Sequence, residues 1–292
     1  MAVGDGTAVE AAAGAEAAVG WPDAETLRAL LAASPDLRWL HTMSAGVDRL
    51  MIPEVVERDR LVVTNNSGAF DVPIAEHVLA TILAAAKHLP QRFAAQRRRQ
   101  WREGGVQHAE IRDATLVVLG MGSIGGEIAR LAAACGMRVI GVRRRATTTA
   151  PPGVRVVGVE RLDEVVAEAD HLAIAAPLTA ETRGIVSADL IARLKPTAWV
   201  INIARGALVD EPALLAACKE RRIGGAALDV FLTEPLPPDS EWWTLPNAIV
   251  TPHVSNSSPR VRERSIGLLL ENLRRFKSGE PLLNVVDKRA GY

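Results

Sequence analysis

Residues 115–145, which read TLVVLGMGSIGGEIARLAAACGMRVIGVRRR, decide the fold of this chain. Residues 117–119 form the continuous apolar run that is typical of a parallel strand buried on both faces. After the glycines, apolar residues recur at helical spacing until Gly136, which is placed to end the helix. Residues 137–142 predict a second strand. The stretch therefore predicts a strand, a glycine turn, a helix and a second parallel strand.

The turn between the first strand and the helix has the spacing GxGxxG, at Gly120, Gly122 and Gly125. The first glycine permits a tight bend, the second lets backbone N–H groups approach a pyrophosphate, and the third lets the helix pack closely on the strand. The positive end of the helix then faces the phosphate. The spacing also occurs in turns without a ligand, but its strand and helix context favours a dinucleotide site that includes Ser123 and Ile124.

Length and composition restrict the class of protein. The 292 residues suffice for two domains, and 48% hydrophobic with 23% charged residues is typical of soluble globular chains. Lys plus Arg equals Asp plus Glu at 34 each, so no global charge favours nucleic acid or an anionic membrane. Both cysteines, Cys135 and Cys218, lie in apolar helical patterns, which predicts buried free thiols.

No apolar run approaches the roughly 18 to 20 residues of a membrane span, and no basic region with an apolar core opens the chain. We therefore expect a cytoplasmic protein. An Ala/Gly-rich opening covers residues 1–20, and its residues 17–19 fit either a small strand or a frayed terminus.

The rest of the chain alternates between helical and strand patterns, which predicts parallel sheets with right-handed crossovers. A long apolar helix is predicted from Pro73, continuing into the arginine-rich residues 91–102. The arginines there are Arg92, Arg97, Arg98, Arg99 and Arg102, and aromatic residues do not alternate regularly with them, so a solvated helix face is favoured over a nucleic-acid patch. The other predicted strands cover 37–41, 61–64, 154–157, 171–175, 199–203, 226–230 and 249–251, and helices are predicted over 162–169, 211–221 and 261–276.

Polar residues follow three of these strands. Arg205, Glu234 and His253 each come just after a predicted strand, and the carboxyl ends of parallel strands are where such sheets bind ligands. We therefore expect the three side chains to converge beside the cofactor. The small-residue turn Ala45-Gly46-Val47 also follows a strand, and its exposed N–H groups suit a carboxylate, although an ordinary strand-to-helix turn is the alternative interpretation.

Five motifs together resemble the D-isomer-specific 2-hydroxyacid dehydrogenase family, which includes glyoxylate/hydroxypyruvate reductases and phosphoglycerate dehydrogenase. They are VLGMGSIG at 118–125, PLTAETRG at 177–184, NIARGALVD at 202–210, LDVFLTEP at 228–235 and TPH at 251–253. The resemblance covers the chain from about Gly20 onward.

The resemblance implies a set of site residues. The catalytic residues would be Arg205, Glu234 and His253, with Ala45, Gly46 and Val47 as the loop that binds the substrate carboxylate together with Arg205. Asp229 would meet the nicotinamide carboxamide. Further cofactor contacts would come from Ala176, Pro177, Thr182, Ile203, Ala204 and His253. The resemblance implies no metal, and it implies a homodimer formed through the dinucleotide domain.

The resemblance also implies a fold of two doubly wound α/β domains. A central Rossmann dinucleotide-binding domain, residues 91–266, would be inserted in a discontinuous flavodoxin-like substrate domain made of residues 1–90 and 267–292. The family has a further strand and helix ahead of Gly20. Because the Ala/Gly-rich opening stands there instead, we expect a substrate domain shortened at its N-terminus.

The residues fit the chemistry of an oxidoreductase (EC 1.1.1.-) that interconverts a small 2-keto acid and a D-2-hydroxy acid. His253 as an imidazolium can donate the proton that the carbonyl oxygen needs, and Glu234 would stabilise that charge. Arg205 offers a planar fork of donors to the carboxylate and polarises the carbonyl. In the oxidation direction neutral His253 acts as the base.

The residues after the second strand indicate which dinucleotide binds. NAD-preferring sites usually place an acidic residue there to bind the ribose hydroxyls. This chain has Arg143, Arg144 and Arg145 instead, and guanidinium groups pair with a 2′-phosphate. The sequence therefore favours NADP (NADPH) over NAD, with a basic surface turn as the alternative.

Two other functions remain open from the sequence. The scaffold could serve another substrate, such as phosphoglycerate, formate or phosphite. It could also be a non-enzymatic dinucleotide-sensing protein, although a sensor has no need of Arg205, Glu234 and His253 together. In either case we expect a small-molecule ligand, with no nucleic acid and no membrane as partner.

Overall fold

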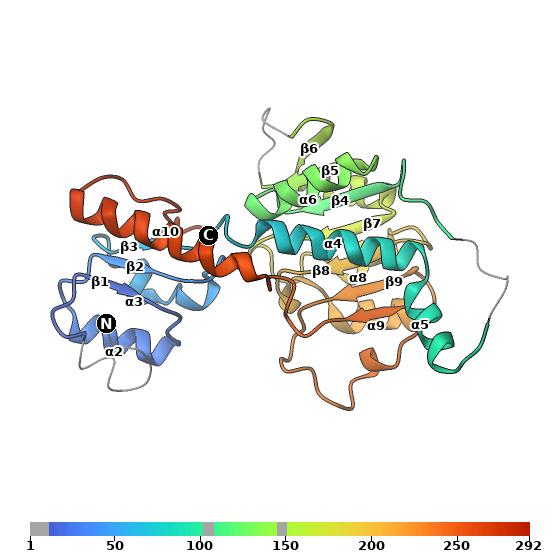
Figure 1. Ribbon diagram of the computed structural model, residues 1–292, viewed down its shortest axis with the longest axis horizontal. Coiled ribbons are helices and arrows are strands. Elements are labelled where there is room, and N and C mark those ends of the chain that lie inside the picture. The colour runs from blue at the N-terminus through green and yellow to red at the C-terminus, as the bar shows by residue number, and fades with distance from the viewer. Residues whose placement is uncertain (1–11, 102–107, 145–150) are drawn as a thin grey trace. The chain divides into compact units, whose positions relative to one another are not determined.

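The computed structural model describes residues 12–101, 108–144 and 151–292, and its chain divides into two compact units (Figure 1). One unit consists of Met1–Phe70 and Ser258–Tyr292, and the other of Asp71–Ser257. We call them the terminal unit and the central unit. Each has its own parallel sheet, which confirms the predicted α/β class.

The terminal unit is built on a three-stranded parallel sheet in the order β1-β2-β3. Its strands are β1 (Ala17–Val19), β2 (Trp39–His41) and β3 (Val62–Thr64), and its helices are α2 (Ala24–Ala33), η1 (Asp48–Leu50), α3 (Pro53–Val56) and α10 (Pro259–Ser278). Residues 17–19 are thus a strand. Asp23 caps α2 by accepting a hydrogen bond from the N–H of Thr26 at 2.8 Å, and Leu27, Leu30 and Leu31 bury the face of α2.

The two ends of the chain complete this unit together. In Figure 1 helix α10, drawn in red, lies beside the blue strands, and the ring of Phe276 on α10 lies 5.3 Å from that of Trp39 on β2. Beyond α10, Val285 forms an antiparallel bridge with Thr64, and the N–H of Val286 donates to the carbonyl of Val63 at 2.8 Å. The C-terminal tail therefore pairs with the edge strand β3, which satisfies backbone groups that an edge leaves open.

The central unit has a seven-stranded parallel sheet in the order β10-β9-β8-β7-β4-β5-β6. The strands are β4 (Thr115–Leu119), β5 (Arg138–Arg143), β6 (Val154–Gly158), β7 (His171–Ile174), β8 (Trp199–Asn202), β9 (Gly225–Leu228) and β10 (Ala248–Val250). Strands β4, β7, β8 and β9 are buried throughout, as their apolar runs predict. The chain adds β5 and β6 on one side of β4 and β7 on the other. The order therefore reverses between β4 and β7, the point at which such sheets bind ligands.

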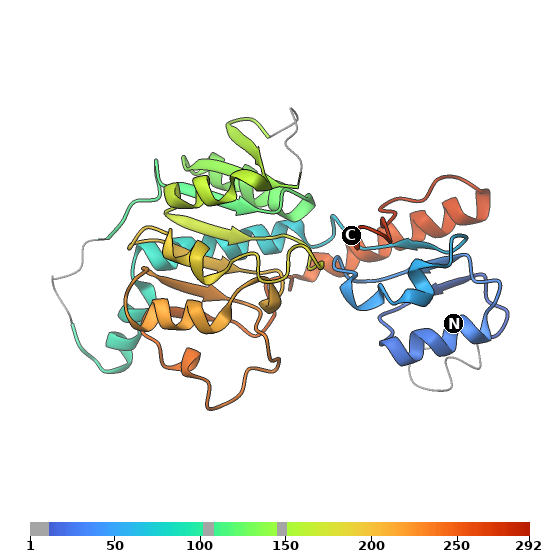
Figure 2. The ribbon, with the colours of Figure 1, turned by 180° about the vertical axis from the view of Figure 1, so that it is seen from behind.

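Helices cover both faces of this sheet (Figures 1 and 2). Figure 1 shows α4 (Asp71–Ala86) and α6 (Ser123–Ala134) in front of the sheet, and Figure 2, from behind, shows α7 (Leu162–Val165), α8 (Ala188–Ala192) and α9 (Glu211–Lys219) on the other face. The remaining elements are α5 (Leu89–Arg97), η2 (Val159–Arg161), η3 (Val166–Glu168), η4 (Gly206–Leu208) and η5 (Glu241–Trp243). The helix predicted over 162–169 is thus split into α7 and η3.

The prediction of one long helix from Pro73 through residue 102 is wrong, because the structure has two helices there, α4 and α5. It breaks after Ala86, and α5 leaves at 69° to α4. His88 at the break has φ 51°, and Pro90 stands in the first turn of α5, where its ring cannot continue a preceding helix. No single helix among the described residues is long and apolar enough to span a membrane. The bent pair α4 and α5 together reaches that length and composition, and nothing beyond length and composition indicates a span.

The division into units differs from the boundaries expected after residues 90 and 266. The contacts place the changes after Phe70 and Ser257, so α4 groups with the central unit and the whole of α10 with the terminal unit. The reason is packing, because α4 lies against α6 and buries residues such as Ile74, Val78 and Ile82.

The two cysteines differ in exposure. Cys218 is buried as expected, whereas Cys135 is partly exposed, and both are free thiols.

Candidate active site

The three glycines of the turn between β4 and α6 have different surroundings: two pack tightly against other backbone atoms, and the third borders open space. Gly120 has φ 100°, and a Cβ there would lie 2.5 Å from the amide nitrogen of Ala176. A Cβ on Gly125 would lie 1.8 Å from the carbonyl oxygen of Gly120. A Cβ on Gly122 would meet no protein atom within 4 Å. Packing therefore requires Gly120 and Gly125, while the open space over Gly122 fits the close approach of a pyrophosphate.

The N-terminus of α6 offers unused donors beside that space. Gly122 caps the helix without a side chain, and the N–H groups of Ser123, Ile124 and Gly125, all described, donate no hydrogen bond within the protein. Three such groups at the positive end of a helix suit a phosphate. The hydroxyl of Ser123 donates to the carboxylate of Asp71, the first residue of α4. Sequence patterns did not indicate Asp71.

The arginines predicted to select the cofactor follow β5. Arg143 ends the strand half-buried, Arg144 is exposed, and Arg145 lies outside the described residues. The pKa of the Glu181 carboxyl lies below its usual value because of a hydrogen bond from Thr179, with a smaller effect of the charge on Arg144. The positive charge of Arg144 thus favours the ionised form of the Glu181 carboxyl.

This loop, residues 177–184, follows β7 and closes on itself. The hydroxyl of Thr182 donates to the carbonyl of Pro177 at 2.6 Å and accepts from the N–H of Thr179 at 2.8 Å. Ala176 before it is buried and packs against Gly120. Thr182 thus shapes the loop; its contact with a cofactor stays a prediction.

The residue Asn202 at the end of β8 orders the turn that carries Arg205. Its side-chain amide donates to the carbonyl of Arg205 at 2.9 Å, and its side-chain oxygen accepts from the N–H of Ala204 at 3.0 Å. Asn202 is 1% exposed and Ile203 is buried, so the turn is fixed at its base. Asn202 belongs to the motif NIARGALVD at 202–210, but the position of polar residues just after strands did not indicate this role.

Glu234 and His253 form a direct pair. One carboxylate oxygen of Glu234 lies 2.8 Å from Nδ1 of His253, and the other accepts from the N–H of Phe231 at 3.0 Å. With Nδ1–H donating to Glu234, the ring has Nε2 available for a substrate. The His253 side chain is 42% exposed, which leaves it accessible to a small molecule.

The backbone at His253 is held in a conformation that L-residues rarely adopt, with φ 55°. Its N–H donates to the backbone carbonyl of Asp229 at 2.8 Å. The Asp229 carboxylate accepts from the Thr251 hydroxyl at 2.6 Å and from the N–H groups of Val254 and Ser255 at 3.0 and 2.9 Å. Burial raises the pKa of this carboxyl, but the hydrogen bonds outweigh burial and place the pKa below its usual value. Asp229 therefore orders the histidine loop, and its predicted contact with a nicotinamide carboxamide stays a prediction.

Close backbone packing joins the arginine turn to the glutamate loop. A Cβ on Gly206 would lie 2.1 Å from the carbonyl carbon of Phe231, so the turn after Arg205 lies directly against the loop of Glu234. The central unit thus brings together the loops of all three predicted catalytic residues.

The predicted carboxylate loop lies in the terminal unit, after β2. The N–H groups of Ala45, Gly46 and Val47, all within the described chain, donate no hydrogen bond to the protein. Asn65 and Asn66 brace the loop, because the side chain of Asn65 donates to the carbonyl of Ala45 and the N–H of Asn66 donates to that of Ser44, both at 2.9 Å. The loop therefore offers three consecutive donors to an anion.

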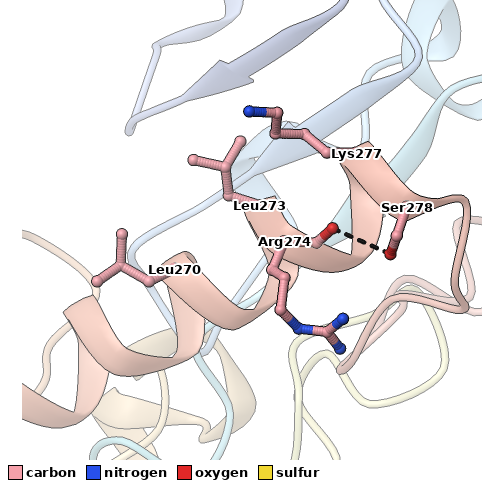
Figure 3. Close-up of a pocket in the computed structure, with 5 residues that line it drawn as sticks. All are labelled: Leu270, Leu273, Arg274, Lys277 and Ser278. Atoms are coloured by element: carbon pink, nitrogen blue, oxygen red, sulfur yellow. Dashed lines mark hydrogen bonds between the residues drawn. The ribbon is translucent and has the colours of Figure 1, made fainter.

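A shallow groove on α10 is separate from these residues (Figure 3). Leu270, Leu273, Arg274, Lys277 and Ser278 line it along one helix. Leu270 is 58% exposed, and none of the predicted site residues lines the groove. Among the described residues, no group of three His, Cys, Asp or Glu side chains is arranged to hold a metal ion.

Comparisons with known proteins indicate the same family that the five sequence motifs resemble. The profile of a family described as "D-isomer specific 2-hydroxyacid dehydrogenase, NAD binding domain" matches residues 79–255. A glyoxylate reductase of Korarchaeum cryptofilum is 34% identical over 262 residues, which are 88% of this chain and 78% of that protein. A D-3-phosphoglycerate dehydrogenase of Methanocaldococcus jannaschii is 34% identical over 86% of this chain and 48% of that protein, so the chain spans about half the length of that relative.

A solved structure resembles most of the chain. The NADPH-dependent glyoxylate/hydroxypyruvate reductase of Sinorhizobium meliloti, solved in complex with NADP and sulfate, is 34% identical, with a TM-score of 0.85. The match covers 95% of this chain and 86% of that one. The likeness therefore extends over both units and supports the predicted dinucleotide-binding fold.

Proposed function

Because the chain belongs to the D-isomer-specific 2-hydroxyacid dehydrogenase family, we propose that it reduces a small 2-keto acid to the D-2-hydroxy acid, preferring NADPH. The observation that carries the proposal is the pair of Glu234 and His253, 2.8 Å apart beside the turn of Arg205. Bound NADPH would supply a hydride to the carbonyl carbon. A proton donor and a cation for the carboxylate are then the groups that the chain itself must provide.

His253 would provide the proton, and Glu234 would stabilise the protonated form of His253. Protonated His253 donates from Nε2 to the carbonyl oxygen as the hydride reaches the carbon, so that the keto acid becomes a hydroxy acid and the imidazole becomes neutral. Glu234, fixed by the N–H of Phe231, stabilises the imidazolium and holds the ring through Nδ1. Arg205 would bind the carboxylate and the carbonyl oxygen through its guanidinium fork.

Two parts of the cofactor site support the proposed binding of NADPH. The space over Gly122 and the unused donors at the start of α6 fit a pyrophosphate. Arg143 and Arg144 would pair with the 2′-phosphate. The NADP in the complex of the Sinorhizobium meliloti reductase is in keeping with this preference. The loop Ala45–Gly46–Val47 would bind the substrate carboxylate.

Glyoxylate and hydroxypyruvate are the substrates that we propose first, because the relatives from Korarchaeum cryptofilum and Sinorhizobium meliloti carry these names. The Methanocaldococcus jannaschii relative favours 3-phosphohydroxypyruvate as a second candidate. We further propose a homodimer, which light scattering of the purified chain would test.

A spectrophotometric screen tests the reaction, the cofactor and the substrate together. Oxidation of NADPH and NADH is followed with glyoxylate, hydroxypyruvate, 3-phosphohydroxypyruvate, pyruvate and branched 2-keto acids. We expect turnover with at least one small keto acid and a Michaelis constant for NADPH well below that for NADH. Equal or better use of NADH would refute the cofactor preference. NADPH binding without turnover of any keto acid would favour the sensor.

The variant His253→Ala tests the proton donor. We expect its rate of keto acid reduction to fall by at least ~100-fold, because general acid catalysis typically contributes that much. NADPH affinity, measured by fluorescence, should remain close to that of the wild type. Turnover like that of the wild type would rule out His253 as the donor.

A further inference from the structure

The loop that carries Glu234 has little regular structure of its own. After β9 ends at Leu228, the next element is the short η5, so residues 229–240 lie outside helices and strands. Within residues 230–236, all described, two backbone N–H groups donate hydrogen bonds: that of Phe231 to Glu234 itself, and that of Leu232 to Glu211. Glu211 is therefore the hydrogen-bond acceptor outside the loop for this segment.

The carboxylate of Glu211 binds the loop at two points. One oxygen accepts from the N–H of Leu232 at 2.7 Å, and the other accepts from the indole N–H of Trp242 at 3.2 Å. Trp242 is 2% exposed and belongs to the hydrophobic core of the central unit. A single side chain thus joins the first part of the loop to η5, the element that follows the loop.

Glu211 itself stands on a rigid support, because it is the first residue of α9. Asp210 caps this helix by accepting from the N–H of Ala213 at 3.0 Å, and Leu214, Ala217 and Cys218 bury the helix against the core. The position of Glu211 is therefore fixed by packing rather than by the loop that it holds.

We propose that Glu211 is a positioning residue for Glu234 and, through it, for the imidazolium of His253. Consecutive N–H groups link the two carboxylates: that of Phe231 binds Glu234, and that of Leu232 binds Glu211. Fixing the peptide at Leu232 fixes the donor that orients Glu234, and Glu234 contacts Nδ1 of His253. The inference rests on the proposed function, in which Glu234 stabilises protonated His253.

The first test is the variant Glu211→Gln, whose amide keeps the size of the side chain but can accept only one of the two hydrogen bonds. We expect kcat for keto acid reduction to fall by ~10-fold, a part of the effect of a general acid, with an unchanged dissociation constant for NADPH. The pH at which reduction falls to half should move to lower pH, because a displaced Glu234 stabilises the imidazolium less.

Glu241→Gln is the matched control. Glu241 is an exposed carboxylate near the end of the same loop, 2.5 Å from the Lys219 ammonium, and has no contact with Glu234. Its replacement should leave kcat and the pH profile unchanged. If Glu241→Gln and Glu211→Gln have equal effects on the pH profile, the positioning role is refuted.

A double-mutant cycle with Glu234→Gln tests whether Glu211 acts through Glu234. In the Glu234→Gln background, Glu211→Gln should change kcat by less than ~2-fold, since the group that it positions is gone. If the two replacements instead multiply, Glu211 acts independently of Glu234 and the proposal fails.

A histidine NMR measurement separates this inference from the proposed function, because it needs no turnover. The chain has 6 histidines, and the resonance lost in His253→Gln identifies His253. In folded Glu211→Gln the His253 resonance should move in the same direction as in Glu234→Gln, and by less, because the contact of Glu234 with Nδ1 is loosened rather than removed. An unchanged His253 resonance in folded Glu211→Gln overturns the positioning role even if the enzyme reduces keto acids. A changed resonance in a chain without turnover refutes the proposed function alone.

Discussion

His253 is held by two carboxylates that have different tasks. Glu234 contacts the ring at Nδ1, whereas Asp229 binds the hydroxyl and N–H groups of the loop around the residue. The backbone of His253 has φ 55°, a conformation that costs of order 1 kcal/mol or more and persists only where its surroundings enforce it. The hydrogen bonds to Asp229 supply that enforcement, so the direction of the imidazole depends on a residue that contacts only its backbone.

A buried histidine away from this site makes the stability depend on pH. His171 at the start of β7 is 6% exposed, and burial lowers its pKa from 6.5 to about 4. Below pH 6.5 the unfolded chain binds a proton that the folded chain does not. The free energy of unfolding should therefore fall by roughly 3 kcal/mol between pH 6.5 and 4, and no further from this group below pH 4.

Urea unfolding of His171→Gln measures this contribution. The variant should lose stability at pH 7, because a polar group is still buried, but should lose less of it on acidification than the wild type. The exposed His108, replaced by Gln, is the control and should keep the dependence of the wild type. Parallel pH dependences for His171→Gln and the wild type would contradict the assignment to His171.

At the scale of elements, the strand-turn-helix of β4 and α6 offers two adjacent glycines with opposite requirements. A Cβ on Gly125 would overlap the carbonyl of Gly120, whereas a Cβ on Gly126 would meet no atom within 4 Å. Gly125→Ala should destabilise the protein by roughly 1–3 kcal/mol and weaken NADPH binding, because α6 must move away from β4. Gly126→Ala should stabilise it by about 0.5–1 kcal/mol, since alanine favours the helix.

Thermal unfolding and NADPH titration of the two variants check this contrast. Equal stability of Gly125→Ala and Gly126→Ala would mean that the contact between α6 and β4 yields without cost. The result would then contradict the role given to the third glycine of the turn.

The elements also differ in how far the sequence predicts them. The strands of the central sheet follow the predicted ranges within about two residues, because apolar runs bounded by turns leave few alternatives. The apolar stripe of α4 predicts one helix that continues across the break between α4 and α5, although Pro90, which signals the break, is in the sequence. Residues 91–102 have no apolar stripe that supports a continuing helix.

At the scale of the whole molecule, each of the two units has buried apolar residues of its own. The core of the central unit includes Leu172 and Val200, and that of the terminal unit includes Leu27 and Leu40. Calorimetry should therefore show two unfolding transitions. NADPH at 100 times its dissociation constant should stabilise the central unit by about 2.7 kcal/mol and raise one transition by roughly 5–10 °C.

The other transition should move little, because the dinucleotide turn lies wholly in the central unit. A single transition that NADPH shifts as a whole would instead show that the two cores unfold together.

The sequence by itself determined the parallel α/β class, the dinucleotide turn and the choice of Arg205, Glu234 and His253. These depend on local patterns: apolar runs, glycine spacing and polar residues at strand ends. Only the tertiary structure decided which groups hold them in place. Glu211, Asn202 and the loop-ordering role of Asp229 depend on hydrogen bonds between segments distant in sequence, and no periodicity encodes which buried donor a given carboxylate will meet.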